Sequence, residues 1–224
     1  MKLGVLYSGG KDSTLALLKA KEYHTISCLI TLVSDNKESY MFQTPNVEWT
    51  HLHAKALGIP LVKFSTKGEK EKELDDLKKA ILEAKKRYGI EGIVTGAVRS
   101  TYQASRVQKI CHELDLWCFN PLWLKNQMEL LNEVLDQGIV AVISGVFAEP
   151  LDETYLGKPL DKKMVNRLAE AAETHGINPA GEGGEIETTV LFAPGFAQKI
   201  AITKRSKSYA KHSGVFTIEG AELQ

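Results

Sequence analysis

The stretch LGVLYSGGKDSTLALL, residues 3–18, decides the fold of this chain. It begins with apolar residues, continues through a short polar loop with two adjacent glycines, and ends in a run rich in leucine and alanine. This order predicts a buried strand, a tight loop and a helix. The glycines let the loop turn its N–H groups outward, and the start of the helix adds the positive end of its dipole. The stretch therefore predicts an anion-binding site at the end of the first strand.

The overall composition is that of an ordinary soluble globular protein. Of its 224 residues 43% are hydrophobic, and 28 Lys and Arg balance 28 Asp and Glu. The balanced charge argues against nucleic acid as a partner, and no apolar run approaches the ~18 residues that a membrane span needs. We therefore expect a cytoplasmic protein without a membrane partner. Cys28, Cys111 and Cys118 form no Cys-x-x-Cys pair, which favours three buried small hydrophobic residues over a disulfide or zinc site.

The first half of the chain alternates regularly between strand and helix patterns. After the first helix, strands are predicted at 25–33, 59–64, 91–96 and 117–119, and helices at 47–57, 69–88 and 100–114. This alternation predicts a doubly wound parallel α/β sheet with helices on both faces and ligands at the carboxyl ends of the strands. The polar loop 34–46 is too long for a minimal connection, so it is either a binding loop or a solvated one.

The second half departs from this alternation and predicts a smaller α+β part. Helices are expected around 128–135 and 165–172, a strand at 139–147, and a glycine-rich acidic segment at 178–187. Short strands at 199–203 and 215–218 are expected to flank a basic loop with Lys204, Arg205, Lys207, Lys211 and His212. We place the boundary near Trp123, giving parts 1–123 and 124–224 that pack as one body.

Three further clusters fall near ends of predicted strands. Gln103 and Arg106 are three residues apart on one helix face, where they form either a clamp for an anion or a surface salt bridge. The second cluster, at 120–123, contains an aromatic residue that closes a pocket or belongs to the core. The third consists of the carboxylates Glu182, Glu185 and Glu187 on a glycine-rich loop. Three like charges repel one another, so either a cation lies between them or the loop is a solvated acidic surface.

The hexapeptide SGGKDS at 8–13 differs from the Walker P-loop and resembles the signature of the PP-loop ATP pyrophosphatases. The segment Gly-x-x-x-Ser-x-Tyr-Gln-x-x-Arg at 96–106, the Pro-Leu-Trp at 121–123 and the Gly-Glu-x-Gly-Glu-x-Glu-Thr at 181–188 follow it in order. Together they resemble the diphthine–ammonia ligase branch of that superfamily, in its compact single-chain form. The resemblance implies an adenine nucleotide alpha hydrolase-like fold, ATP with Mg²⁺, and ammonium. It also implies translation elongation factor 2 as the protein substrate, amidated from diphthine to diphthamide through an acyl-adenylate.

The resemblance also implies roles for individual residues. The nucleotide loop consists of Ser8, Gly9, Gly10, Lys11, Asp12 and Ser13. Lys11 would stabilise the leaving pyrophosphate, and Asp12 would hold the metal or position the loop. Gln103 or Arg106 would orient the carboxylate, and Glu182, Glu185 and Glu187 would gather ammonium or accept its proton. The chain has no paired cysteines for sulfur transfer and no room for a glutaminase domain, which favours free ammonia as the nitrogen source.

Two other functions stay open on the sequence. One is a PP-loop enzyme that adenylates another carboxylate or a tRNA base, for which the basic segment 204–212 could provide contacts. The other is a sensor that binds ATP or AMP without turnover. His51 and His53 are two residues apart, so they cannot form the i, i+4 metal pair, and both are interpreted as ordinary helix residues. No protein-built metal site is predicted, and a homodimer is left open.

Overall fold

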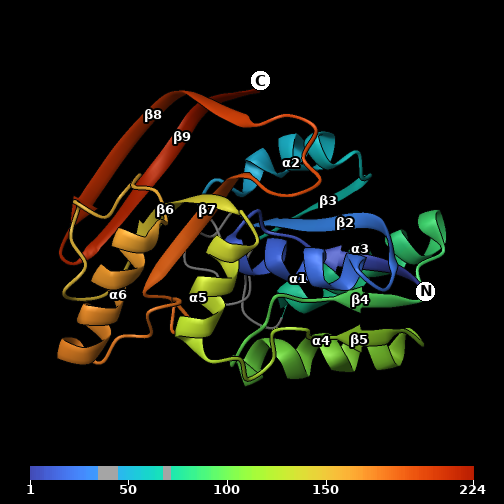
Figure 1. The fold of residues 1–224 in the computed structure, drawn as a ribbon. Coiled ribbons are helices and arrows are strands. Elements are labelled where there is room, and N and C mark those ends of the chain that lie inside the picture. The colour runs from blue at the N-terminus through green and yellow to red at the C-terminus, as the bar shows by residue number, and fades with distance from the viewer. Residues whose placement is uncertain (35–44, 68–71) are drawn as a thin grey trace.

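The computed structural model describes residues 1–34, 45–67 and 72–224. The first part contains β1 (Lys2–Leu6), α1 (Lys11–Lys21), β2 (Thr25–Ser34), the 3₁₀ turn η1 (Val47–Trp49), α2 (Thr50–Leu57), β3 (Leu61–Thr66), α3 (Lys72–Tyr88), β4 (Gly92–Val94), α4 (Thr101–Glu113) and β5 (Trp117–Phe119) (Figure 1). The second part contains α5 (Gln127–Asp136), β6 (Val140–Val146), α6 (Lys162–His175), β7 (Ile186–Phe192), β8 (Ile200–Ala210) and β9 (Ser213–Leu223). Most of the predicted loop 34–46 and the first residues of the predicted helix 69–88 lie outside the described residues.

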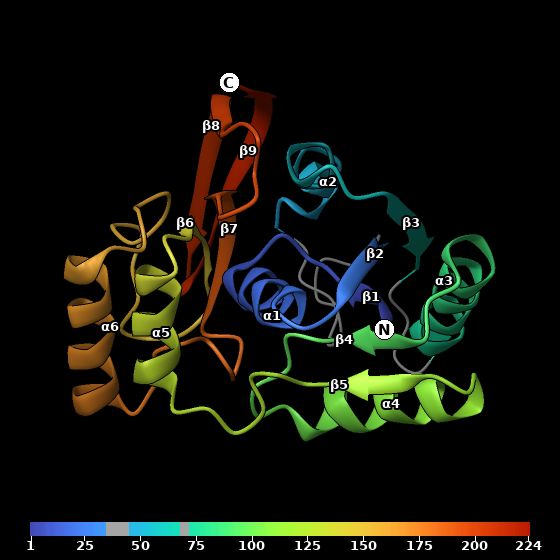
Figure 2. The ribbon, with the colours of Figure 1, turned by 45° about the vertical axis from the view of Figure 1, so that its right-hand side comes forward.

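Five parallel strands form the first sheet, in the order β3-β2-β1-β4-β5. Helices α3 and α4 cover one face of this sheet, while α1 and α2 lie on the other (Figure 2). Its inner strand β2 is buried continuously from Cys28 to Leu32, as expected for a strand covered on both faces. The predicted doubly wound α/β fold is confirmed.

The strand order reverses at β1, because the chain first moves outward to β2 and β3 and then returns to place β4 on the other side of β1. Loops that leave β1 and β4 therefore diverge and open a crevice at the carboxyl ends of these strands. The loop 8–13 joins β1 to α1 at this point. The topology thus places the segment that decides the fold at the ligand-binding edge of the sheet.

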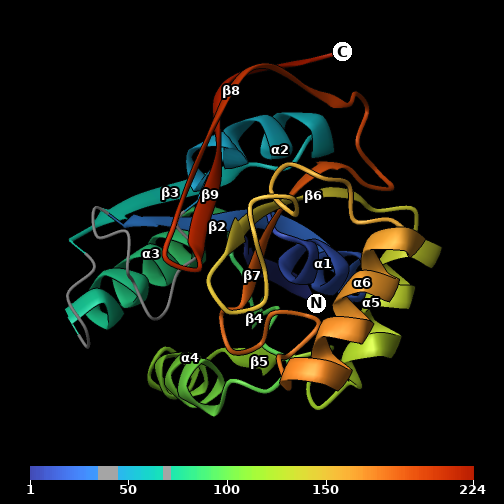
Figure 3. The same cartoon turned by 90° about the vertical axis from the view of Figure 1, so that its left-hand side faces the viewer.

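A separate antiparallel sheet in the order β7-β6-β9-β8 forms the second part. Strands β8 and β9 make a long hairpin that extends along one side of the molecule (Figure 3). Its two-residue turn consists of Lys211 and His212, with φ of 50° and 62°, as a tight hairpin turn requires.

The hairpin corrects the prediction of a basic loop. Lys204, Arg205 and Lys207 lie within β8, and only Lys211 and His212 form the turn. Side chains from Lys204 to Ser208 are exposed on both faces of the strand. The sequence therefore lacks the alternation of apolar and polar residues by which a half-buried strand is recognised.

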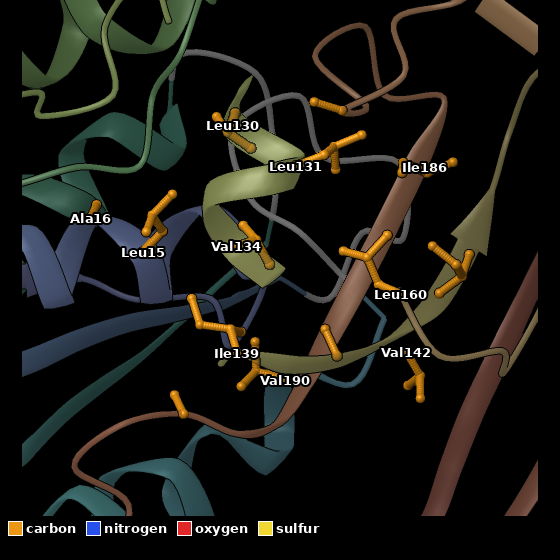
Figure 4. Close-up of a cluster of buried hydrophobic side chains, with 14 of the residues drawn as sticks. Leu15, Ala16, Leu130, Leu131, Val134, Ile139, Val142, Leu160, Ile186 and Val190 are labelled. Atoms are coloured by element: carbon orange, nitrogen blue, oxygen red, sulfur yellow. The ribbon is translucent and has the colours of Figure 1, made fainter. Parts of the chain in front are cut away.

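The two parts share one hydrophobic core. Figure 4 shows Leu15 and Ala16 of α1 near Leu130 and Val134 of α5, with Ile139 next to them. The same cluster extends to Val142, Ile186 and Val190 of the second sheet. Helix α1, which covers one face of the parallel sheet, therefore also packs against the helices and strands of the second part.

Candidate functional site

A cleft of about 1280 Å³ opens at the carboxyl ends of β1, β2 and β4 and continues onto one face of the second sheet. It is lined by residues of both parts. The predicted site residues among them are Ser8, Lys11, Asp12, Ser13, Gln103, Glu182 and Glu187. Leu32, Val33 and Ser34 at the end of β2 also line it. Residues more than 170 positions apart in the sequence thus meet around one space.

The loop 8–13 has the backbone of an anion site. Gly9 has φ of +81°, a conformation that other residues rarely adopt, and Gly10 caps α1 without a side chain. Thr14 donates its amide to the Gly10 carbonyl and begins the helical hydrogen bonds. Within the described part of the chain, the amides of Asp12 and Ser13 have no acceptor. These two N–H groups, at the positive end of the helix dipole, are available to an anion in the cleft.

Strand β7 holds this loop from the other part of the molecule. The Lys11 amide donates to Thr188 Oγ1 at 3.1 Å, and the Val190 amide donates to the Gly9 carbonyl at 2.9 Å. The loop therefore continues the free edge of the second sheet. Its conformation depends on β7, a strand that the sequence analysis did not predict.

The Lys11 side chain is 3% exposed and is already paired. Its Nζ donates to Asp12 Oδ2 at 2.8 Å and to the Ala180 carbonyl at 2.6 Å. These contacts fix the ammonium group beside the loop and next to the acidic segment. Asp12 Oδ1 is buried and has no donor among the described residues. One carboxylate oxygen of the loop is thus left for a ligand.

His53 packs against the loop 8–13 at Gly9. The sequence analysis interpreted it as an ordinary helix residue and missed this role. The ring is 1% exposed, and a Cβ at Gly9 would lie 3.1 Å from its Cε1 atom. His53 Nε2 lies 2.7 Å from the Val190 carbonyl and Nδ1 lies 3.1 Å from the Trp49 carbonyl. Burial lowers the pKa of His53 to about 4, so the ring is neutral at pH 7. A neutral imidazole donates to only one of these two carbonyls, and its ring packs between α2, β7 and the loop without adding charge.

Gly96, after β4, allows the close approach of two backbones. A Cβ at this position would lie 2.8 Å from the Ser13 nitrogen and 2.9 Å from the Asp12 carbonyl carbon. Only a residue without a side chain brings the end of β4 this near to the start of α1. Gly96 thereby positions one wall of the cleft against the loop 8–13.

The three glutamates of the acidic segment have different surroundings. Glu185 accepts hydrogen bonds from the Asn178 amide, from Asn178 Nδ2 and from the Gly183 amide, at 3.0, 2.6 and 2.8 Å. It therefore shapes the loop, and it is absent from the described residues that line the cleft. Glu182 lines the cleft and accepts from the Arg99 amide at 2.9 Å. Burial and the nearby charge of Asp12 raise the pKa of Glu182.

Glu187 differs from both. Its Oε2 atom is buried and has no hydrogen-bond donor within the described ranges. Burial raises the pKa of Glu187 to about 8, and no cation in the described part of the chain opposes the shift. The three glutamates therefore do not form one shared cluster. Glu185 holds the loop in shape, Glu182 lies near the loop 8–13, and Glu187 lies on β7 without a charge partner among the described residues.

Gln103 and Arg106 also have different positions relative to the cleft. Gln103 lines the cleft near the start of α4, whose N-cap Ser100 accepts from the Gln103 amide at 3.3 Å. The Arg106 guanidinium lies over the Tyr102 ring, 3.6 Å from Cζ to the ring centroid. Neither Arg106 nor Trp123 is among the described residues lining the cleft, whereas Tyr102 is.

Asn46 fixes the segment before α2 against the second sheet. Its Nδ2 donates to Thr189 Oγ1 and to the Phe216 carbonyl, and its Oδ1 accepts from the Ile218 amide. Asn46 itself has φ of 62°, which asparagine tolerates better than most residues. A buried asparagine with satisfied amide and carbonyl groups thus holds one edge of the cleft.

Comparison with known proteins gives matches over nearly the whole chain. A family model described as the diphthamide synthase N-terminal domain matches residues 1–117, and one described as the diphthamide synthase C-terminal domain matches residues 126–223. A diphthine–ammonia ligase of Bos taurus is 35% identical over 222 residues, covering 90% of this chain and 83% of that protein. A diphthine–ammonia ligase of Danio rerio is 34% identical over 221 residues, covering 90% and 86%.

Among solved structures, a predicted subunit of tRNA methyltransferase from Methanocaldococcus jannaschii matches with a TM-score of 0.42 and 15% identity. The match covers 87% of this chain and 98% of that one. The likeness is too loose to support a conclusion. Within the described ranges, no helix combines the length and apolar character that crossing a bilayer requires.

Proposed function

The chain belongs to the diphthamide synthase family, and from this premise we propose that it is an ATP-dependent ligase that forms a C–N bond. The proposed reaction is the amidation of diphthine on translation elongation factor 2, with ammonium as the nitrogen source and diphthamide as the product. AMP and pyrophosphate are the other products. The observation that most supports this function is the meeting of the nucleotide loop and the acidic segment in one cleft.

In the first proposed step the loop binds the β and γ phosphates of ATP. The Asp12 and Ser13 amides donate to phosphate oxygens, and the Lys11 ammonium stabilises the charge that develops on pyrophosphate. An oxygen of the diphthine carboxylate attacks the α phosphorus, the bond from that phosphorus to the bridging oxygen breaks, and pyrophosphate leaves. Gln103 is proposed to orient the incoming carboxylate, since it lines the cleft beside the loop. Arg106 would assist from the next turn of α4.

In the second step ammonia attacks the acyl carbon of the adenylate, and AMP leaves with the bonding electrons of the C–O bond. The nucleophile is neutral ammonia, so ammonium must first lose a proton. Glu182, on the cleft side of the acidic segment, is the proposed acceptor, and Glu185 holds that segment in shape. Catalysis in this scheme comes from positioning and charge stabilisation.

The loop residues also fit a magnesium ion. Asp12 Oδ1 is buried without a donor among the described residues, and the Asp12 charge raises the pKa of Glu182, so two carboxyl groups lie near each other. Mg²⁺ is commonly bound by one or two carboxylates together with substrate phosphates. Asp12 would hold the ion together with the phosphates, and the ion would neutralise phosphate charge, while Glu182 stays the proposed proton acceptor.

Substitution of Lys11 tests the assignment of the loop. Lys11→Ala removes the buried ammonium, and we expect kcat for pyrophosphate release to fall by about 100-fold or more. The matched control is Lys19→Ala, on the same helix, where Nζ pairs with Glu133 away from the cleft. The assay contains diphthine-bearing elongation factor 2, ATP and ammonium. It measures AMP, pyrophosphate and the small mass decrease from acid to amide.

Each outcome of this assay decides between functions. Wild-type turnover in Lys11→Ala would overturn the loop assignment. Absence of AMP with every carboxylate and ammonium would indicate a nucleotide-binding sensor. Formation of AMP only when tRNA is present would indicate an enzyme that acts on a tRNA base.

A further inference from the structure

Phe147, Gly145 and Glu187 lie on one face of the second sheet, at the wall of the cleft. Gly145 pairs with Glu187 across β6 and β7, and the Phe147 amide donates to the Glu185 carbonyl one step further along. Side chains alternate between the faces of a sheet, so Phe147 and Glu187 are diagonal neighbours on the same face. Both line the cleft.

Gly145 leaves the space in which the Phe147 ring lies. A Cβ at this glycine would lie 2.5 Å from Phe147 Cε2, 2.7 Å from Phe147 Cζ and 3.4 Å from the Glu187 Cβ. The ring therefore lies over the bare backbone of Gly145, beside the Glu187 side chain. Val215 is the partner of Gly145 on β9 and also lines the cleft. This part of the cleft wall, called the pocket below, consists of aromatic, aliphatic and backbone surface with one carboxyl group.

This pocket is incomplete without a cation. Phe147 is 39% exposed although it is a large apolar side chain, and Glu187 Oε2 is buried with no donor among the described residues. An aromatic face attracts cations electrostatically, and aromatic pockets with a carboxylate are a common way to bind quaternary ammonium groups. A quaternary ammonium group needs no hydrogen-bond acceptors, whereas an ammonium ion donates four hydrogen bonds. The apolar lining therefore favours the quaternary group.

The substrate of the proposed function carries such a group. In diphthine a trimethylammonium group is attached to the carbon that bears the carboxylate. The site for this cation must therefore lie next to the position where the carboxylate reacts. Glu187 precedes Thr188, which accepts the hydrogen bond from the Lys11 amide. The pocket and the nucleotide loop are thus adjacent along β7.

Resting on the proposed function, we infer that Phe147, Gly145 and Glu187 form the subsite for the trimethylammonium group of diphthine. The ring face and the Glu187 carboxylate enclose the cation, and the reactive carboxylate extends from it toward the loop. Glu187 holds its proton while it is buried without a partner. Binding of the substrate cation favours its ionised form, and the cation balances the charge that results.

Kinetics with separate substrates test this subsite. Phe147→Leu keeps an apolar side chain but removes the aromatic face, and Glu187→Gln keeps the shape but removes the charge. For each we expect KM for diphthine-bearing elongation factor 2 to rise about tenfold, with KM for ATP and for ammonium within about twofold of wild type. Phe192→Leu on β7 and the exposed Glu149→Gln are matched controls, since neither residue is in the described lining of the cleft.

A rise in KM for ammonium, with KM for the protein substrate unchanged, would overturn the inference and assign the pocket to ammonium. Unchanged constants in both variants, with an active wild type, would also overturn it while leaving the proposed function intact. If the wild type forms neither AMP nor amide, the proposed function fails. Nuclear magnetic resonance titration with tetramethylammonium then decides the subsite separately. Binding that is lost in Phe147→Leu and is not reproduced by ammonium supports it, and equal binding to both proteins contradicts it.

Discussion

Glu187 combines a buried oxygen without a donor, within the described residues, with a position on the wall of the cleft. Burial without a partner is unfavourable for an ionised carboxylate, so the buried Glu187 side chain keeps its proton at pH values at which an exposed glutamate is ionised. The raised pKa of about 8 follows from desolvation alone. A residue that is costly to the folded state and lies in a cleft is more readily explained by a ligand than by stability.

The titration of Glu187 predicts a pH-dependent stability. Its pKa is 4.5 ordinarily and about 8 in the folded protein, so the folded state binds the proton more tightly. The stabilisation is fully present below pH 4.5 and is lost as the pH rises through 8. Glu187→Gln cannot ionise. We therefore expect the difference in Tm, variant minus wild type, to increase from about pH 5 to about pH 9. Each kcal/mol of stabilisation that the wild type loses over this range corresponds to about 2–4 °C in Tm.

Thermal unfolding at several pH values checks this expectation. Glu149→Gln, which alters an exposed carboxyl group, is the control for the loss of one negative charge. A difference in Tm between Glu187→Gln and wild type that stays constant with pH would contradict the burial of an ionisable group at this position.

At the scale of residues, the sequence predicted those whose chemistry is carried by a recognisable motif. The structure brings Lys11, Asp12, Glu182 and Glu187 to one cleft, as expected for the loop and the acidic segment, while their roles stay predictions. His53 could not be assigned, because its importance lies in contacts with Gly9 and Val190 that are remote in sequence. The different surroundings of the three glutamates likewise depend on the tertiary structure.

At the scale of elements, β7 connects the candidate nucleotide site to the second sheet. Thr188 accepts from the Lys11 amide on the loop, while its neighbour Thr189 accepts from Asn46. Both threonines are buried, and both accept a hydrogen bond from the first part of the chain. The strand therefore offers two similar side chains: among the described residues, Thr188 contacts the loop and Thr189 contacts Asn46.

This pair predicts separate effects on stability and on nucleotide binding. Thr188→Val and Thr189→Val each leave a buried donor without its acceptor, so we expect each to lower the free energy of unfolding by about 1–3 kcal/mol. Thr188→Val alone should also raise Kd for ATP by about fivefold to tenfold, because it disturbs the amide of Lys11. Denaturant unfolding and calorimetric titration with ATP measure the two effects. Equal ATP affinities in the two variants would show that β7 does not hold the loop.

The parallel strands were predictable and the antiparallel ones only partly so. Strands buried on both faces, such as β2, are continuous apolar runs, and the helices between them have clear stripes. The β8–β9 hairpin is polar on both faces over much of its length, so its pattern resembled a loop. Strand β7 follows directly on the acidic segment, whose glycines indicated a loop, although Ile186, Thr188, Thr189 and Val190 favour a strand.

At the scale of the whole molecule, the two sheets are built from different halves of the chain but bury one common core. Leu15 of α1, Val134 of α5 and Val190 of β7 belong to the same cluster (Figure 4). Removing either half would expose the apolar surface of the other. The chain therefore has little opportunity to unfold one part while the other stays folded.

We accordingly expect a single cooperative unfolding transition. Far-ultraviolet circular dichroism reports both parts, and tryptophan fluorescence reports chiefly Trp49, Trp117 and Trp123 of the first part. The two denaturation curves should coincide. The fragment 1–123 should fail to bind ATP, because it lacks the acceptor Thr188 and the donor Val190. Two separated transitions, or a fragment that binds ATP as the full chain does, would contradict this view.

The two hydrogen bonds between β7 and the loop have a thermodynamic consequence. The strand that holds Gly9 and Lys11 also carries Glu187, three residues before Val190. A ligand on either side that shifts β7 changes the free energy of the other site. Such coupling is reciprocal, so the factor by which the protein substrate tightens ATP binding must equal the factor by which ATP tightens binding of that substrate. The Gly9 carbonyl and the Lys11 amide thus give the two sites a physical route for coupling, and its size is the same whichever ligand binds first.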